Sequence, residues 1–412
     1  MAETTDATLG AKGRFEALKY RDFRLIFFTG GISTTGNWME IIIRNWLVYR
    51  ISGGSPMILG LSNLVHWLPF LILSPIAGVF VDRWEKKWLL LATQTTLTVV
   101  TTLLGILTLL DIIQIWHILL LTLIHGISEA VDSPARQSLV SDLVDKEAVM
   151  NAVSLNSTVY YGTRLIGPAI GGFLITIAGI GMGFLINALT FVPYVMALLL
   201  IKPASSSRLE GKTWGNFIEG LSYVRKNTAA LTILIVVGII SVFTISYQTL
   251  LPIFADTILR VGPKGLGLLS AATGLGSVIG SLLLAFYSHR ITRQGRFICA
   301  MATCFGISLL IFAFSQAFWL SLLCLVVTGA SNTTFTASGN AVLQTSVPAN
   351  LRGRVMGVYA MTSQGTNVFG SLLIGGLGSA FGATGGLAIS SAIAILAAVL
   401  SFMLAPGFRR LP

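Results

Sequence analysis

Long apolar stretches dominate this chain, separated by short segments that contain charged residues, glycine or proline. Most stretches reach about twenty residues, the length of helix that crosses a hydrocarbon layer about 30 Å thick. We therefore predict twelve membrane-spanning helices. They lie near 23–50, 56–80, 88–110, 113–133, 150–177, 181–201, 229–257, 265–288, 296–315, 317–338, 353–379 and 384–405.

The composition agrees with an all-α polytopic membrane protein. Hydrophobic residues make up 54% of the 412 residues and charged residues only 10%, whereas about 25% of a soluble domain is charged. The 43 glycines fit this class because small residues let helices pack closely in a bilayer. The three cysteines fall inside apolar segments, which indicates packing residues rather than disulfides or metal ligands. We expect the protein in the cell membrane, in contact with lipids, as a monomer.

Lysine and arginine positions predict the orientation. If both termini are cytoplasmic, 22 of the 27 basic residues fall on the inner side. Of the other five, Arg44 and Arg164 lie within spans, and Arg50, Arg260 and Lys264 lie outside. This bias follows the positive-inside rule, so we predict cytoplasmic termini. The net charge of +11 is then explained by basic residues on the inner side of the membrane, so we expect no nucleic-acid partner.

The longest polar connection, 202–228, divides the chain into predicted six-helix bundles at 1–201 and 229–412. We expect this connection to be a cytoplasmic linker. Four apolar residues in it have helical spacing, which suits a helix lying at the inner membrane interface. They are Trp214, Phe217, Leu221 and Val224. An ordinary linker is the alternative.

The two predicted bundles contain an internal repeat. The segment from His125 aligns with the segment from Thr328 at a constant offset of 203 residues, and 60–83 aligns with 267–290 at an offset of 207. The first offset also matches Gly162 with Gly365, Gly167 with Gly370, and Gly172 with Gly375. Repeats related by an axis along the membrane normal allow one half to rock against the other, which favours a transporter.

Residues 78–87 read GVFVDRWEKK, between the second and third spans. This stretch resembles the corresponding loop motif of the major facilitator superfamily, with Glu85 in place of the usual glycine. We expect Gly78 to permit close helix approach and Asp82 to accept hydrogen bonds from a helix N-terminus or an arginine. Arg83 would anchor the inner face. The resemblance implies a gating role for Gly78, Asp82 and Arg83.

Residues 167–172 read GPAIGG, similar to the core of the antiporter motif in exporter branches of that superfamily. Together with WLVYRISGGSPMILGL and DSPARQSLVSDLV, this stretch makes the chain resemble the branch that contains enterobactin exporters and macrolide efflux proteins. The resemblance implies two pseudo-symmetric bundles of six helices and export by alternating access. It also implies a gating role for Gly167 and Pro168.

Charged residues inside the spans are the main functional candidates, because ionisable groups in hydrocarbon are costly. Glu40 and Arg44 are four residues apart, so we predict an ion pair on one helix face, with Asn37 on the same face. A pair that only offsets its own burial is the alternative.

The repeat singles out a second set of charges. Glu129 matches Asn332, and Arg164 matches Asn367. The N-terminal half has charged residues at two positions where the C-terminal half has asparagine. We therefore predict that the N-terminal half holds the ion-coupling or charged-substrate site. Asp132, one turn after Glu129, is a gating candidate.

A carboxylate can load and release a proton if an arginine partner moves away from it. We expect Arg44 or Arg164 to be that partner for Glu40 or Glu129. His66 and His125 also lie in spans and could relay protons. We favour neutral, hydrogen-bonded histidines, and neither shows the spacing of metal ligands.

Polar and aromatic residues of the second half suit a cavity for an amphipathic ligand, and we expect about half of them to contact it. They are Phe243, Tyr247, Gln248, Asn332, Phe335, Asn340, Tyr359, Gln364 and Asn367. The leading hypothesis is proton-coupled export of a siderophore-like or drug-like small molecule, with the proton gradient as energy source and no cofactor. Alternatives are a lipid or lysophospholipid flippase, and a non-transporting membrane sensor or scaffold. We find no phosphate-binding loop or metal motif, so we predict that the chain is not an enzyme.

Overall fold

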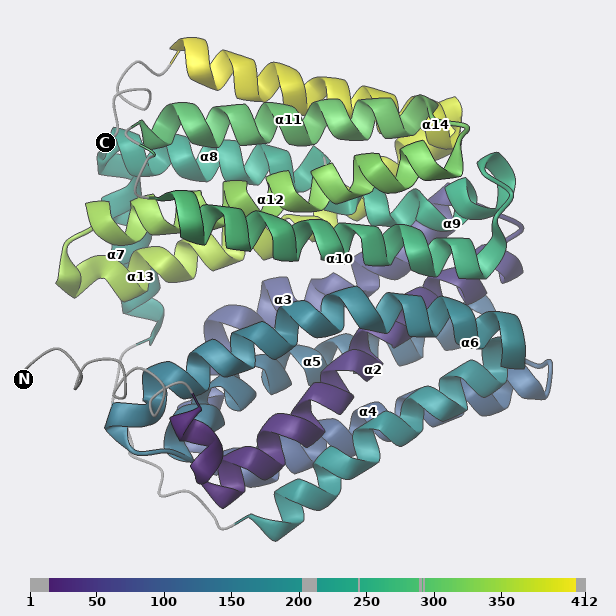
Figure 1. The fold of residues 1–412 in the computed structure, drawn as a ribbon, viewed down its shortest axis with the longest axis horizontal. Helices are drawn as coiled ribbons and strands as arrows, with labels where there is room; N and C mark the ends of the chain where they lie inside the picture. Colours follow the sequence, from purple (N-terminus) through teal and green to yellow (C-terminus); the bar gives the residue numbers. More distant parts are fainter. Residues whose placement is uncertain (1–14, 202–212, 244, 289–290, 292, 405–412) are drawn as a thin grey trace, which may run out of the picture.

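The computed structural model describes residues 15–201, 213–243, 245–288, 291 and 293–404 (Figure 1). All the elements in these ranges are helices. In the bilayer core no water can satisfy backbone polar groups, and a helix satisfies them within one segment. The apolar patterning of the sequence therefore becomes a set of long, nearly parallel helices.

The N-terminal elements lie together in the lower part of Figure 1. They are η1 (Glu16–Lys19), α2 (Arg21–Ile51), α3 (Pro56–Arg83), α4 (Lys86–Leu109), α5 (Ile115–Asp142), η2 (Lys146–Ala148) and α6 (Val149–Leu200). The 52-residue α6 consists of two helical segments, because Gly179 interrupts it with φ 82° and ψ 172°. Only glycine adopts such a backbone conformation without strain.

The C-terminal elements lie in the upper part of Figure 1. They are α7 (Thr213–Lys226), α8 (Thr228–Phe243), η3 (Ile245–Leu250), α9 (Leu251–Ile253), η4 (Phe254–Ile258), α10 (Gly262–Tyr287), α11 (Gln294–Phe314), α12 (Phe318–Ser346), α13 (Ala349–Ala360), η6 (Met361–Gly365) and α14 (Asn367–Leu404). Gly382, with φ 74° and ψ 165°, interrupts α14 as Gly179 interrupts α6.

The predicted spans fall on these helices, but several ends differ, and the predicted spans 229–257 and 353–379 change helix type in their interiors, the second at η6. We predicted that two helices end near 133 and 338, but α5 continues to Asp142 and α12 to Ser346. Hydropathy detects where lipid contact ends, whereas the helix continues into polar sequence beyond it. The predicted span 229–257 is also interrupted at η3, shortly before Pro252, which has no backbone N–H to donate.

Nine helical segments of the described chain are long and apolar enough to cross a membrane. Two of these, Lys146–Leu200 and Leu351–Met403, are more than fifty residues long and contain the glycine interruptions. The helix α2 is outside this set, since Asn37, Glu40 and Arg44 lower its hydropathy.

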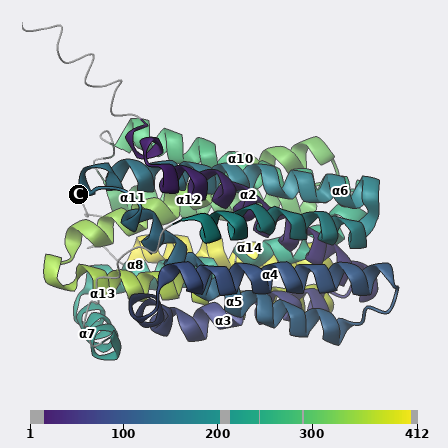
Figure 2. The ribbon, with the colours of Figure 1, turned by 90° about the horizontal axis from the view of Figure 1, so that it is seen from below.

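The predicted helix of the polar connection is present as α7, which lies beside α13 (Figure 2). Val224 is buried, and Glu219 forms an ion pair with Arg354 of α13. The side chains of Trp214 and Phe217 are outside the described residues. Its position at the membrane interface stays a prediction.

Two equivalent glycine contacts join the N-terminal and C-terminal groups of helices. A Cβ atom added at Gly60 of α3 would lie 2.5 Å from the Ser371 carbonyl oxygen of α14. At Gly267 of α10 it would lie 2.6 Å from the Pro168 carbonyl oxygen of α6. Gly60 corresponds to Gly267 at the offset of 207 residues, and Pro168 corresponds to Ser371 at the offset of 203, so the two contacts are equivalent in the repeat. The interruptions at 179 and 382 are likewise 203 apart, so the internal repeat is confirmed.

Gly375 offers a test of this close approach. A Cβ at this position would lie 2.8 Å from the Pro56 carbonyl oxygen, so Gly375→Ala should cost roughly 1–3 kcal/mol and lower the melting temperature in detergent. Gly376→Ala is the matched control, because no described atom lies within 4 Å of its added Cβ. Equal melting temperatures for the two variants would contradict the packing described here.

Candidate functional site

Two neighbouring cavities lie among the helices. The first, the central cavity, has a volume of about 640 Å³ and is lined from both groups of helices. The second, the side cavity, has about 550 Å³ and is lined by α2, α3, α5 and α6. Both cavities have Trp38, Ile41, Trp67, Tyr160 and Tyr161 in their walls. The polar side chains in these walls therefore face a cavity between the helices and not the surrounding lipid.

The central cavity is bounded differently at its two ends. At the end of α2, the Tyr49 hydroxyl donates to the Asp256 carboxylate at 2.8 Å and joins the two groups of helices. In the other direction the wall continues to Gln344, near the end of α12, and this end of α12 lies on the side of α7 (Figure 1). The cavity thus extends toward the end that carries α7.

The predicted pair of Glu40 and Arg44 is confirmed. Arg44 Nε donates to Glu40 Oε1 at 2.8 Å, and both side chains are fully buried. Arg44 also donates to Ser62 Oγ at 3.2 Å and lines the central cavity. One oxygen of Glu40 and one nitrogen of Arg44 find no hydrogen-bond partner in the described chain. The pair is therefore incompletely satisfied, and its arginine borders the cavity.

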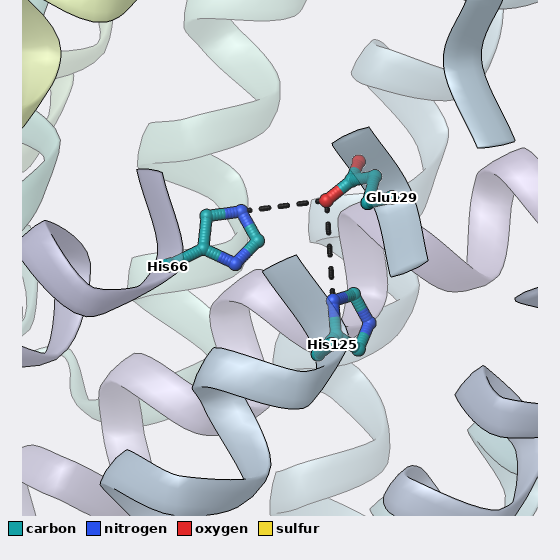
Figure 3. Close-up of side chains that lie close together, drawn as sticks. All are labelled: His66, His125 and Glu129. Atoms are coloured by element: carbon teal, nitrogen blue, oxygen red, sulfur yellow. Dashed lines mark ion pairs between the residues drawn. The ribbon is translucent and has the colours of Figure 1, made fainter. Parts of the chain in front are cut away.

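The predicted arginine partner of Glu129 is wrong for this structure. Glu129 Oε2 lies 3.4 Å from His66 Nε2 and 3.9 Å from His125 Nδ1 (Figure 3). Arg164 instead lies with its guanidinium 5.4 Å from the Trp38 ring centroid, and no carboxylate of the described residues is within 4.0 Å of it. Glu129 of α5 thus contacts His66 of α3, and it also borders the side cavity, whose wall includes residues of α6.

The two histidines also differ from expectation. Both imidazoles are buried, and none of their four ring nitrogens has a hydrogen-bond partner among described atoms. The donor atoms of His66, His125 and Glu129 lie within 4.8 Å of one another, so these residues could hold a metal ion. Sequence spacing missed the group because His66 comes from a different helix. The four-residue spacing of His125 and Glu129 was the available signal.

Asp132 lies in a buried hydrogen-bond network. Arg136 Nη2 pairs with Asp132 Oδ2 at 3.0 Å, and Gln94 Nε2 donates to Oδ1 at 2.7 Å. Arg136 also donates to the Gly30 carbonyl oxygen and lies 4.2 Å from the Tyr194 ring centroid. Arg136 is one of the 22 basic residues expected on the inner side, and its sequence position alone does not indicate this network. The network joins α2, α4, α5 and α6, and the gating role of Asp132 stays a prediction.

The predicted amides line the cavities. Asn332 and Asn367 line the central cavity and Asn37 lines the side cavity, each with an unpartnered Oδ1 in the described structure. Of the other second-half residues, Gln248, Asn340 and Tyr359 line the central cavity, whereas Tyr247 and Phe335 are buried away from it.

The gating candidates of the two sequence motifs have different outcomes. The backbone of α3 passes through Gly78, Asp82 and Arg83, but their side chains are outside the described residues. Gly167 packs against Trp38 of α2, where an added Cβ would lie 2.6 Å from the Trp38 Cβ. Pro168 contacts Gly267 through its carbonyl oxygen. These positions are tight helix contacts, and gating by them stays a prediction.

Comparison with known proteins decides the family. The family described as transmembrane secretion effector matches residues 12–407. The chain belongs to this family, a branch of the major facilitator superfamily. Its resemblance to that superfamily is thereby confirmed, and the chain is a multi-pass membrane transporter rather than an enzyme.

Relatives agree with this assignment. The chain is 26% identical to the staphyloferrin A transporter of Staphylococcus aureus, with 84% of this chain and 87% of the relative covered. It is 21% identical to macrolide efflux protein A of Streptococcus pyogenes, covering 82% and 85%. It is 24% identical to the enterobactin exporter EntS of Escherichia coli, covering 74% and 73%. A solved structure of the nucleoside transporter NupG has the same fold, with a TM-score of 0.78, 12% identity and coverage of 93% and 100%.

The Asp132 network gives a stability prediction for this transporter. Asp132→Ala removes the partner of the buried Arg136 and should cost about 3–5 kcal/mol. Asp142→Ala, which removes the more exposed partner of Lys86, should cost about 0–1 kcal/mol. Denaturant unfolding of the purified variants compares the two costs. A smaller loss for Asp132→Ala than for Asp142→Ala would contradict the structural role of the network.

Proposed function

We propose that this transporter exports a small amphipathic molecule by alternating access. The observation that carries the proposal is the central cavity, which lies between two groups of helices related by the internal repeat. Its volume suits a small molecule, and its wall combines aromatic rings with amides and hydroxyls. Movement of one group against the other would expose this cavity to each side in turn.

The proposal includes twelve membrane crossings. The interruptions at Gly179 and Gly382 divide two long segments into two crossings each, and α2 adds the crossing with the buried ion pair. Six crossings then fall in 1–201 and six in 229–412, with 202–228 as the cytoplasmic linker. The distribution of basic residues favours a cytoplasmic position for both termini and for α7. In this orientation the Tyr49 and Asp256 contact would lie at the outer end, and the cavity would open inward.

For the substrate, we propose a siderophore-like or drug-like molecule. The names of the relatives include siderophore and macrolide transporters. In the central cavity Arg164 has no carboxylate partner in the described chain and lies over Trp38. This arrangement favours an anionic group beside an aromatic surface, with Asn332 and Asn367 available for hydrogen bonds.

For energy coupling, we propose that the proton gradient acts on Glu40. The hypothesis requires a carboxylate with an arginine partner, and Glu40 has Arg44 whereas Glu129 has none within 4.0 Å among the described residues. Protonation of Glu40 from outside would release Arg44, which borders the central cavity, and so promote substrate release. No cofactor takes part in this scheme.

Arg164→Gln tests the substrate site. Loss of a charge-assisted hydrogen bond of about 1.5–3 kcal/mol should weaken binding of a carboxylate-bearing siderophore by at least about tenfold. Binding of a macrolide without a carboxylate should change little. Arg50→Gln, the same substitution at an exposed position outside the cavity, is the control. Tryptophan fluorescence titration measures both ligands, and an equal effect on the two would exclude Arg164 as an anion site.

Glu40→Gln tests the coupling in proteoliposomes with an imposed pH gradient. The variant should still exchange substrate across the membrane but should lose accumulation driven by the gradient. The double variant Glu40→Gln, Arg44→Gln leaves no unpaired charge, so it controls for misfolding and should be equally uncoupled. The substrate panel contains siderophores, macrolides, dyes and lysophospholipids. Proton-driven accumulation by Glu40→Gln at the native rate would refute this assignment.

A further inference from the structure

The proposed coupling scheme leaves the group of His66, His125 and Glu129 unused. His66 is on α3, and His125 and Glu129 are one turn apart on α5 (Figure 3). Both imidazoles are about 1% exposed and the glutamate side chain is 22% exposed. Glu129 Oε2 points between the two rings, as the dashed lines in Figure 3 show.

Each member of this group has unsatisfied polar atoms. All four ring nitrogens and Glu129 Oε2 have no hydrogen-bond partner in the described part of the protein. A buried polar atom without a partner costs free energy, and most such atoms in proteins are bonded to protein, water or an ion. His66 Nε2, His125 Nδ1 and Glu129 Oε2 all lack hydrogen-bond partners in the described structure and face one another, which indicates a ligand between them.

The donor set selects the chemical class of that ligand. Two imidazole nitrogens and one carboxylate oxygen are ligands of Zn²⁺ and of other divalent transition-metal ions, whereas Mg²⁺ and Ca²⁺ prefer oxygen donors alone. With metal–donor bonds of about 2.0–2.2 Å, tetrahedral donors lie about 3.3–3.5 Å apart. The observed separations of 3.4 and 3.9 Å from Glu129 Oε2 are close to this value.

The surroundings permit an ion to enter and to remain. His66 borders the central cavity and Glu129 borders the side cavity, so open coordination positions can face water or substrate. The neighbouring cations Arg44 and Arg136 are bonded to Glu40 and Asp132, which neutralises them.

We propose that His66, His125 and Glu129 form a binding site for a divalent transition-metal ion, with Zn²⁺ or Co²⁺ as suitable probes. Its ligands come from α3 and α5, so the ion links these two helices within the N-terminal group. This inference goes beyond the proposed transport function and does not depend on it.

The experiment uses the full chain without an affinity tag, purified in detergent and stripped with a chelator. Calorimetric titration with Zn²⁺ should give one ion per chain, and Co²⁺ should give the visible absorption of a tetrahedral site. Zn²⁺ should also raise the melting temperature, because it binds the folded chain. His66→Gln, His125→Gln and Glu129→Gln each remove a direct ligand, so each should weaken binding by at least the roughly 10–100-fold that loss of an outer-shell partner costs.

Two further variants keep the test decisive. His117→Gln changes a histidine of α5 outside the group and should bind the ion as the native chain does. His125→Cys retains a ligand and should bind Co²⁺ with an added sulfur-to-cobalt absorption, which a purely structural histidine would not produce. Absence of stoichiometric binding to the native chain, or equal binding by the Gln variants, would overturn the proposal. Because no transport is measured, failure here leaves the export hypothesis standing, and failure of export leaves this site standing.

Discussion

The structure depends on the inability of hydrocarbon to solvate polar groups. Backbone N–H and C=O groups must be satisfied within each segment, which makes every described element helical. The same constraint restricts charge to places where a partner or a cavity is available. Glu40 is fully buried only because Arg44 is bonded to it, and Arg136 is held by Asp132. The buried charges Arg44 and Asp132 accordingly have ion-pair partners and also line a cavity.

Close backbone contact is the second requirement, because lipid gives helices little hydrophobic drive to associate. Gly60 against Ser371 and Gly267 against Pro168 bring the two groups of helices together in equivalent ways. In each contact a glycine meets a backbone carbonyl oxygen, so no side chain of the glycine lies between the two helices. The Tyr49 hydrogen bond to Asp256 is a further contact between the two groups of helices.

The asymmetry between the repeats concerns chemistry rather than architecture. The glycine contacts recur at the offsets of 207 and 203 and the helix interruptions at 203, but Glu129 and Arg164 match the amides Asn332 and Asn367. In the folded chain these four residues all border the two cavities. One half therefore supplies charge, and the other supplies neutral hydrogen-bonding groups around the same space. This division is one reason for proposing a ligand with a charged end and a polar or aromatic body.

The sequence by itself determined the helices, the repeat and the pair of Glu40 and Arg44. These features depend on local hydropathy, on register within one helix and on comparison of the chain with itself. Only the tertiary structure decided which helices face one another. It placed His66 beside Glu129, 63 residues away in the sequence, and left Arg164 on Trp38 without a carboxylate partner in the described chain. Contacts between helices depend on how each helix is rotated and packed, and hydropathy along the chain does not specify that rotation.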